Sequence, residues 1–305
     1  MPSSAEVAVS EELFAPVGRG TELCYQTFGS PDGEPLLLVM GLGAPMTWWD
    51  PGLCADLARA GFHVVRFDNR DAGRSTVLAG RVSRSTLVRA FAGTRVRAPY
   101  SLTDLADDAF GLLDHLGLES AHVVGVSMGG MIAQTMAIAR PERVDSLTSI
   151  MSTTGKRSVG WQHPALLPRM IAPRKPGREA YVAGSMVFAR LTGSPAYPEP
   201  EDAMRRRFEE TWDRGVHPEG VARQMLAVVS QPNRGARLHG VRVPTLVVHG
   251  LADRMVHVSG GRATAAAVPG AELLLIDGMG HDLPVPLHET FVNAIRRTAE
   301  RSSGV

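Results

Sequence analysis

The segment Ala121-His122-Val123-Val124-Gly125-Val126-Ser127-Met128-Gly129 decides the fold of this chain of 305 residues. It starts with a short β-branched run, which is typical of a buried strand. The residues that follow, 131–139, are apolar at helical spacing and contain neither glycine nor proline. Ser127 is therefore predicted to lie on a tight turn between a strand and a helix.

Two glycines make this turn sterically feasible. Larger side chains at Gly125 and Gly129 would clash across the turn, which pushes the Ser127 oxygen clear of the sheet edge. The helix that begins at Met128 directs unpaired N–H groups and its positive dipole end toward the same point. This context predicts a nucleophilic serine, and the alternative is a serine that only caps the helix.

A serine nucleophile needs a base and an acid that orients the base. Residues 271–276 form a predicted strand, and the glycine-rich loop after it ends at His281, the predicted general base. Residues 243–250 form another predicted strand, and its exit loop carries Asp253, the predicted orienting acid. The chain order Ser, Asp, His is that of α/β-hydrolases and differs from the orders in the two common serine-protease classes.

Other carboxylates fit the role of orienting acid less well. Asp277 and Asp282 are too close to His281 in sequence for an easy approach to its ring. No Asp or Glu occurs between residues 146 and 178, which excludes an acid placed after the next strand. Asp253 is therefore the preferred candidate.

An oxyanion that forms beside the serine needs a second donor, which is usually a main-chain N–H in the loop after an earlier strand. Residues 35–40 form that strand, and Gly41-Leu42-Gly43 opens its loop. We assign the N–H groups of Leu42 and Met128 to the oxyanion hole. Met40 stands where such loops usually have histidine, so the bracing of this loop is expected to differ.

These motifs resemble the α/β-hydrolase superfamily, and specifically its serine-nucleophile esterase branch, over about residues 21–297. Residues 68–75 resemble the D-x-R-G-x-G-x-S segment that follows the fourth strand in many members, with Asp71 in place of the first glycine. Residues 37–43 and 68–76 together are similar to the aclacinomycin methylesterase-like group. That resemblance implies hydrolysis of a methyl ester on an aromatic polyketide. Similar sequences also occur among bacterial carboxylesterases and lipases.

Strand and helix patterns alternate along most of the chain, which predicts an α/β-hydrolase fold with a mostly parallel central sheet and helices on both faces. This alternation of strand and helix patterns stops between residues 153 and 233, where three or four helices are predicted. We expect this insertion after the sixth strand to form a helical cap over the catalytic loops. The predicted parts are an N-terminal segment (1–20), a core (21–152 and 234–305) and a cap (153–233).

The cap and the loop after Leu42 are rich in apolar side chains that are candidates for an adaptable substrate pocket. Packing between cap helices is the alternative role for each of them. The candidates are Met46, Trp48, Trp49, Trp161, Met186, Phe188, Trp212 and Met225.

Several basic groups near the predicted site have simpler explanations. His249 and His257 flank the acid loop, where we expect solvated or supporting roles. The basic stretch at residues 81–97 is expected to be a solvated loop, although it could attract a carboxylate-bearing substrate.

Composition places the chain among ordinary globular enzymes, with 44% hydrophobic and 21% charged residues and a net charge of +1. That charge argues against nucleic acid or an acidic membrane as a partner. No signal peptide or apolar run of membrane-spanning length is apparent. Cys24 and Cys54 are expected to be buried free thiols in a reducing cytoplasm. No metal-binding motif occurs, and neither a metal nor another cofactor is expected.

The predicted function is hydrolysis of a small-molecule carboxylic ester, a methyl ester or a medium-sized apolar ester, through an acyl-enzyme intermediate. A lactonase, a thioesterase, a carbon–carbon bond hydrolase or a cofactor-free perhydrolase would use the same residues. A non-catalytic ligand receptor on this fold is disfavoured, because it has no physical need for a complete triad. Epoxide hydrolase and haloalkane dehalogenase activities do not fit this chain, because those enzymes resemble this scaffold with a carboxylate in place of Ser127.

Overall fold

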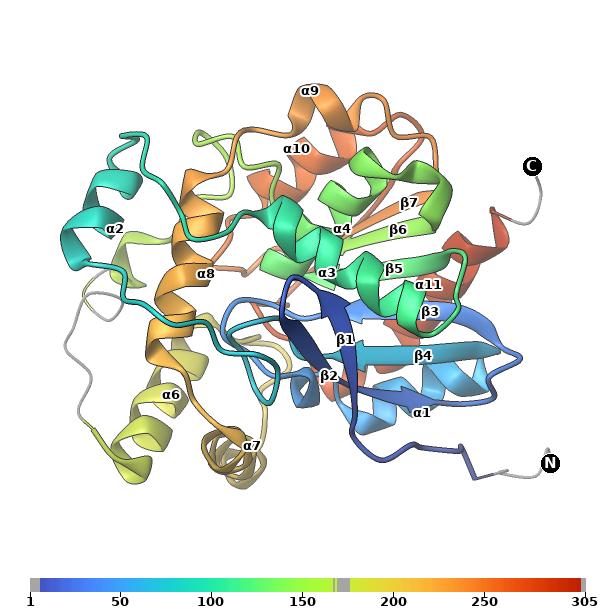
Figure 1. Cartoon of the computed structure of the whole chain (residues 1–305), viewed down its shortest axis with the longest axis horizontal. Coiled ribbons are helices and arrows are strands. Elements are labelled where there is room, and N and C mark those ends of the chain that lie inside the picture. The colour runs from blue at the N-terminus through green and yellow to red at the C-terminus, as the bar shows by residue number, and fades with distance from the viewer. Residues whose placement is uncertain (1–5, 167, 169–175, 303–305) are drawn as a thin grey trace.

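The computed structural model describes residues 6–166, 168 and 176–302, and within them eight strands form one sheet (Figure 1). The spatial order is β1-β2-β4-β3-β5-β6-β7-β8. β1 and β2, and likewise β2 and β4, are antiparallel, while the remaining neighbours are parallel. The strands are β1 (Leu13–Gly18), β2 (Thr21–Phe28), β3 (Glu34–Val39), β4 (Phe62–Phe67), β5 (Ala121–Val126), β6 (Val144–Ile150), β7 (Thr245–Gly250) and β8 (Glu272–Ile276).

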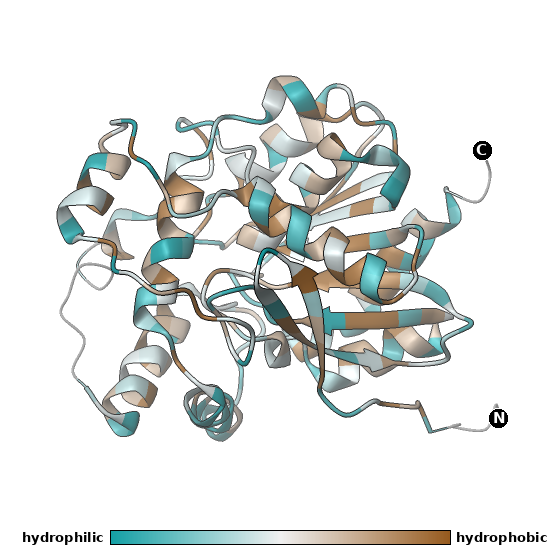
Figure 2. Cartoon of the chain, viewed as in Figure 1, coloured by the Kyte–Doolittle hydropathy of each residue, from teal (hydrophilic) through white to brown (hydrophobic). Residues whose placement is uncertain are grey.

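Helices cover both faces of the sheet. α1 (Pro51–Arg59) and α11 (His288–Glu300) pack on one face. α3 (Leu102–His115), α4 (Met128–Ala139) and α10 (Ser259–Ala267) pack on the other, with the short α9 (Gly235–Leu238) beside α4 and α10. Because both faces are covered, β4, β5 and β7 are buried along their whole length. Figure 2 shows the resulting hydrophobic colouring along the central strands.

Two elements depart from the sequence prediction. Residues 1–20 were expected to lie outside the core, yet Leu13–Gly18 forms the edge strand β1, and residues 1–5 lie outside the described part. Only Ala15 of β1 is buried, so the strand has no clear alternating pattern. The basic stretch expected to be a loop contains helix α2 (Arg84–Phe91), which Ser83 caps by accepting a hydrogen bond from the Thr86 N–H at 3.1 Å.

A cap of helices is inserted after β6, at the sheet edge where the parallel strands end (Figure 1). It contains α6 (Arg178–Thr192), α7 (Glu201–Arg214) and α8 (Pro218–Ser230). α6 and α7 share a small apolar core of Val182, Met186, Met204 and Phe208. Of the predicted cap, residues 167 and 169–175 lie outside the described part. No described helix combines the length and the apolar character needed to cross a bilayer.

The turn at Ser127 is as tight as the glycine spacing indicates. Ser127 has φ 56° and ψ −116°, a conformation that is strained for a residue with a side chain. A Cβ atom on Gly125 would lie 2.2 Å from the Gly129 oxygen, and one on Gly129 would lie 2.0 Å from the Val39 oxygen. Both contacts are with backbone atoms, which cannot move aside. Only glycine fits at these two positions.

We expect Gly129→Ala to lower the free energy of unfolding by about 3 kcal/mol or more, because the new methyl group overlaps the backbone of β3. Gly184→Ala in α6 is the matched control, since a Cβ there meets nothing within 4 Å. That control should be neutral or stabilising by about 0.5–1 kcal/mol. Urea unfolding followed by circular dichroism measures both. Equal stability of the two variants would contradict the packing of this turn against β3.

Candidate active site

Three loops at the carboxyl edge of the sheet bring Ser127, His281 and Asp253 together. The loops follow β5, β8 and β7, respectively. The Ser127 Oγ atom lies 3.1 Å from His281 Nε2, and His281 Nδ1 lies 2.8 Å from Asp253 Oδ2. This is the arrangement of a nucleophile, a base and an acid that orients the base.

The Asp253 carboxylate is fully buried and its two oxygens have different partners. Oδ1 accepts hydrogen bonds from the main-chain N–H groups of Met255 at 2.8 Å and Val256 at 2.9 Å. Oδ2 faces His281. Burial alone would raise the pKa of Asp253, but the His281 and His249 rings outweigh burial and hold that pKa well below its ordinary value. The carboxylate is therefore ionised at neutral pH.

Ionised Asp253 fixes the proton on the His281 ring. A carboxylate can only accept, so His281 Nδ1 must carry the hydrogen, and Nε2 is left with a lone pair toward Ser127. His249, for which a supporting role was one of the two expectations, is buried. It donates from Nε2 to the Val256 oxygen at 2.7 Å, with Asp253 Oδ2 at 3.4 Å. His249 therefore braces the acid loop and is not solvated.

The loop that carries His281 is held by the connection between α6 and α7, which the sequence did not indicate. The His281 N–H donates to the Thr192 oxygen at 2.7 Å, and the Gly280 N–H donates to Ser194 Oγ at 2.8 Å. The Asp282 carboxylate accepts from both the N–H and the hydroxyl of Ser194. Asp282 therefore fixes this loop rather than the His281 ring, and Asp277 is exposed.

The two N–H groups assigned to the oxyanion hole belong to segments beside Ser127. Met128 is the first residue of α4, where N–H groups lack partners within the helix. The loop after β3 passes close by, since a Cβ on Gly41 would lie 3.4 Å from the Ser127 Cβ. For the Leu42 and Met128 N–H groups, no acceptor is recorded within the described chain. The assignment of both N–H groups to an oxyanion hole stays a prediction.

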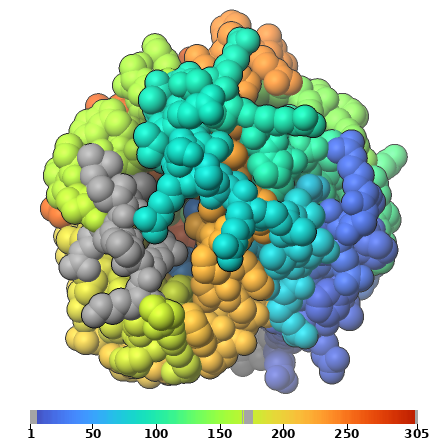
Figure 3. All heavy atoms as spheres, turned by 60° about the vertical axis from the view of Figure 1, so that its left-hand side comes forward, coloured from blue at the N-terminus to red at the C-terminus, as the bar shows by residue number. Residues whose placement is uncertain are grey.

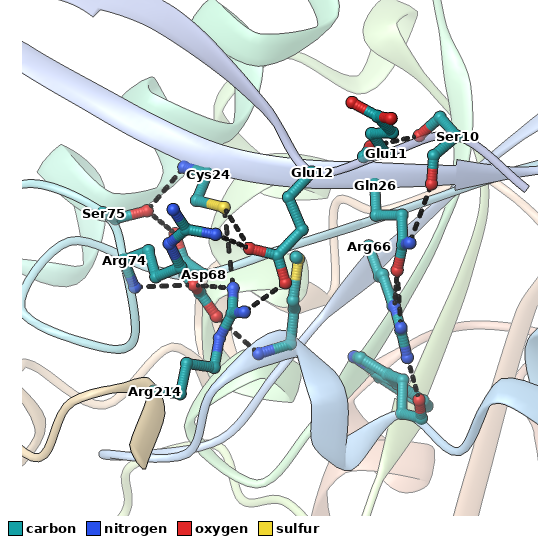
Figure 4. Close-up of polar contacts among 12 residues, drawn as sticks. Ser10, Glu11, Glu12, Cys24, Gln26, Arg66, Asp68, Arg74, Ser75 and Arg214 are labelled. Carbon is teal, nitrogen blue, oxygen red and sulfur yellow. Dashed lines mark hydrogen bonds and ion pairs between the residues drawn. The ribbon is translucent and has the colours of Figure 1, made fainter. Parts of the chain in front are cut away.

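The segment after β4 connects this edge of the sheet to the cap, as Figure 4 shows around Asp68. The fully buried Asp68 carboxylate accepts from the Met46 N–H at 2.6 Å, the Arg74 N–H at 2.8 Å and the Arg214 guanidinium at 2.6 Å. Arg214 is the last residue of α7. Cys24 lies beside it, and burial raises the pKa of this thiol to about 12, so Cys24 stays protonated and is not a second nucleophile.

Asp71, which replaces the first glycine of the family segment, occupies a left-handed position with φ 69°. Its carboxylate accepts from Arg223 Nε at 2.8 Å and Nη2 at 2.7 Å. It also accepts from the Tyr100 hydroxyl at 2.7 Å and the Leu78 N–H at 2.8 Å. Arg223 belongs to α8, so this buried ion pair ties the cap to the core. These hydrogen bonds offset the backbone strain of Asp71, which a glycine at this position would not have.

The predicted pocket residues separate into core, cap-packing and accessible groups. Trp49 is 1% exposed inside the main core, which favours packing, the alternative role, over a place in the pocket. Trp48 packs on the cap by donating from Nε1 to Thr211 Oγ1 at 2.9 Å, and Trp212 packs against Tyr181. Trp161 is 45% exposed. The remaining candidates are buried or half-buried, namely Met46, Met186, Phe188 and Met225.

Trp161 is an exposed aromatic residue near the acid loop. Its ring stacks on His257 with centroids 4.1 Å apart, and its main-chain oxygen accepts from the His257 N–H at 3.2 Å. His257 is four residues after Asp253, which places this stacked pair beside the catalytic loops. The surface is hollowed where α8 and the segment that carries α2 lie next to each other (Figure 3).

Comparisons with known proteins agree with this architecture. Residues 34–285 match the family model described as the alpha/beta hydrolase fold. Rhodomycin D methylesterase DauP of Streptomyces sp. (strain C5) is 30% identical over 90% of this chain and 93% of its own length. A 2-hydroxy-6-oxononadienedioate/2-hydroxy-6-oxononatrienedioate hydrolase of Burkholderia vietnamiensis is 31% identical over 87% of each chain.

Among solved structures, the enol-lactonase of Burkholderia xenovorans LB400 is similar in fold, with a TM-score of 0.73 and 22% identity over 94% of this chain and 100% of the other. The family match covers most of the chain, and the sheet order and the loops at its carboxyl edge are those expected of that family. The chain belongs to the α/β-hydrolase fold family.

Proposed function

We propose that this protein is a carboxylic ester hydrolase that cleaves a methyl ester on a large apolar, aromatic acid. The observation that carries the proposal is the Ser127–His281–Asp253 chain of hydrogen bonds, in which an ionised Asp253 sets the tautomer of the base. The similarity to rhodomycin D methylesterase supports the choice of ester.

The geometry supports a two-step mechanism. The Ser127 oxygen attacks the ester carbonyl carbon while His281 Nε2 takes the hydroxyl proton, and the Leu42 and Met128 N–H groups stabilise the oxyanion. Collapse of this intermediate breaks the bond to the methoxy group, which leaves as methanol with the proton from His281. A water molecule then gives its proton to His281 and attacks the acyl-enzyme. The carboxylic acid departs, and Ser127 recovers its proton.

A methyl ester places different demands on the two sides of the site. The leaving methanol needs little space, so binding energy must come from the acyl part, which lies under the cap in this proposal. The exposed Trp161 and the half-buried Phe188 and Met225 are the candidate contacts for it. We also propose a cytoplasmic location, which the two buried free cysteines support.

Carbon–carbon bond hydrolysis is the second candidate, because one relative at 31% identity carries the name of a hydrolase acting on a 2-hydroxy-6-oxo-dienedioate. Both reactions would use the same three residues. Purified protein should be assayed in parallel with methyl 2-naphthoate, p-nitrophenyl acetate and a 2-hydroxy-6-oxo-dienoate. Release of methanol at a higher kcat/KM than carbon–carbon cleavage supports the esterase, and the reverse order overturns it.

We expect Trp161→Ala to lower kcat/KM for methyl 2-naphthoate by about 3- to 10-fold, the worth of one aromatic contact. The rate on p-nitrophenyl acetate should change by less than about twofold, because a small ester uses the triad with little of the pocket. Phe14→Ala is the control, since Phe14 is 40% exposed on β1, far along the sheet from β7. An equal loss of kcat/KM on both esters would contradict a role of Trp161 in substrate binding and would indicate that it serves packing.

A further inference from the structure

Gln224 of cap helix α8 contacts the loop that carries the oxyanion-hole residue Leu42. Its side chain is completely buried. The amide oxygen accepts from the Gly43 N–H at 2.7 Å, and the amide nitrogen donates to the Arg70 oxygen at 2.8 Å. A main-chain N–H can only donate and a carbonyl can only accept, so these partners fix which end of the amide faces which loop.

The contact with Gly43 restrains the peptide that follows Leu42. The peptides on the other side are restrained as well, because Asn69 Nδ2 donates to the Met40 oxygen at 2.9 Å and the Ala44 N–H reaches the Gly41 oxygen at 3.4 Å. Gly43 itself has φ 69°. With both flanking segments held, the direction of the Leu42 N–H is set before any substrate arrives.

Sterics reinforce this polar contact. A Cβ on Gly43 would lie 2.8 Å from Val221 Cγ2, so α8 and the loop are packed closely as well as hydrogen-bonded. The neighbouring Arg223 has a different task, since its hydrogen bonds within the described chain go to Asp71 and the Gly80 oxygen. Arg223 and Gln224 thus both bind the segment after β4, and Gln224 in addition binds the loop after β3.

We propose that Gln224 is a positioning residue that holds the oxyanion loop from the cap, in place of bracing from the histidine that usually starts this loop. The inference rests on the proposed hydrolase function. An N–H donor acts on the oxyanion only if its direction is fixed in advance, so the contribution of Gln224 appears in the transition state and not in substrate binding. The cap is then part of the catalytic centre. If α8 moved away from the core, the Leu42 N–H would lose its fixed direction.

The test compares Gln224→Met, which has a similar shape and no hydrogen-bonding amide, with the double variant Asp71→Gly/Arg223→Met. The double variant removes both partners of the ion pair between cap and core, so neither the Asp71 nor the Arg223 charge is left buried without its partner. We expect Gln224→Met to lower kcat on p-nitrophenyl acetate by about 10- to 100-fold, less than the full loss of one donor. KM should change by less than about threefold, and the double variant should lose less than about threefold in kcat.

Two further measurements separate positioning from general loosening of the cap. Affinity for phenylboronic acid, which forms a tetrahedral adduct with the serine, should fall in Gln224→Met by the same factor as kcat. Amide hydrogen exchange in a peptide covering residues 41–46 should accelerate in Gln224→Met and stay unchanged in the double variant. If Gln224→Met does not fold, Gln224→Asn, whose amide is one methylene short of Gly43, replaces it.

The outcomes are distinguishable from failure of the proposed function. A wild-type protein that hydrolyses no ester overturns that function, while hydrogen exchange still tests whether Gln224 holds the loop. Active wild-type protein with an equally active Gln224→Met variant overturns the role of Gln224. Equal kcat losses in Gln224→Met and the double variant would also overturn it, because the effect would then come from cap anchoring.

Discussion

Alanine in place of Ser127 is expected to lower kcat by about 10⁴- to 10⁶-fold, because no other group can form the acyl-enzyme. The free energy of unfolding should stay within about 1 kcal/mol of wild type, since Cβ is retained and, among the described residues, the hydrogen-bond partner of the Oγ atom is His281. Steady-state hydrolysis of p-nitrophenyl acetate and urea unfolding measure the two quantities on the same preparation.

A fluorophosphonate probe supplies the direct control for this prediction. It should label wild-type protein on the peptide that contains Ser127 and leave Ser127→Ala unlabelled. Ser185→Ala, on the cap helix α6, should keep both labelling and activity. Labelling at another serine, or normal turnover by Ser127→Ala, would show that the nucleophile lies elsewhere.

The sequence predicted the fold and the three clustered residues because each signal is local. A buried strand followed by a short loop places the loop at the carboxyl edge of a parallel sheet, so Ser127, Asp253 and His281 had to converge there. The glycines around Ser127 are equally local, since their spacing reflects a clash within one turn and with one neighbouring strand.

Contacts between distant segments carried no comparable signal. Gln224 and Gly43 are 181 residues apart, and Arg223 and Asp71 are 152 apart. A polar residue on the buried side of an amphipathic helix interrupts the apolar pattern, but the pattern does not indicate which residue it contacts. Asp71 stood out in the sequence as the replacement of the first glycine of the family segment, but its left-handed conformation and its partner Arg223 required the structure.

Burial explains the remaining differences. Trp49 belongs to a loop that borders the site, yet its side chain is buried in the main core, and a sequence pattern does not distinguish these two directions. The helix α2 was missed because it is only 8 residues long and most of its side chains, including those of Val88 and Phe91, are exposed. Elements at the edges of the molecule are thus the ones that pattern analysis describes least well.

Asparagine in place of Asp253 is expected to lower kcat by about 10⁴-fold, and alkaline pH should not restore it. The oxygen that accepts from Met255 and Val256 should remain an oxygen in the variant, so the new NH₂ group faces His281 Nδ1. His281 must then carry its proton on Nε2, which points a hydrogen at Ser127 and removes the base. Raising the pH does not restore the tautomer of His281 that can accept the Ser127 proton.

The pH dependence distinguishes this mechanism from a simple charge effect. The pKa of Asp253 is depressed in the folded protein, so its contribution to stability is present above the unfolded value near about 4 and is lost as pH falls further. Between pH 5 and 9 the wild-type carboxylate stays ionised, so titration of Asp253 itself adds no pH dependence to kcat in this range. Asp277→Asn, an exposed position in the His281 loop, is the control and should stay within about twofold of wild type at every pH. A variant at position 253 that regains near-normal rates above pH 8 would mean that Asp253 supplies only charge, and the His281 tautomer would then have to be set by a different acceptor.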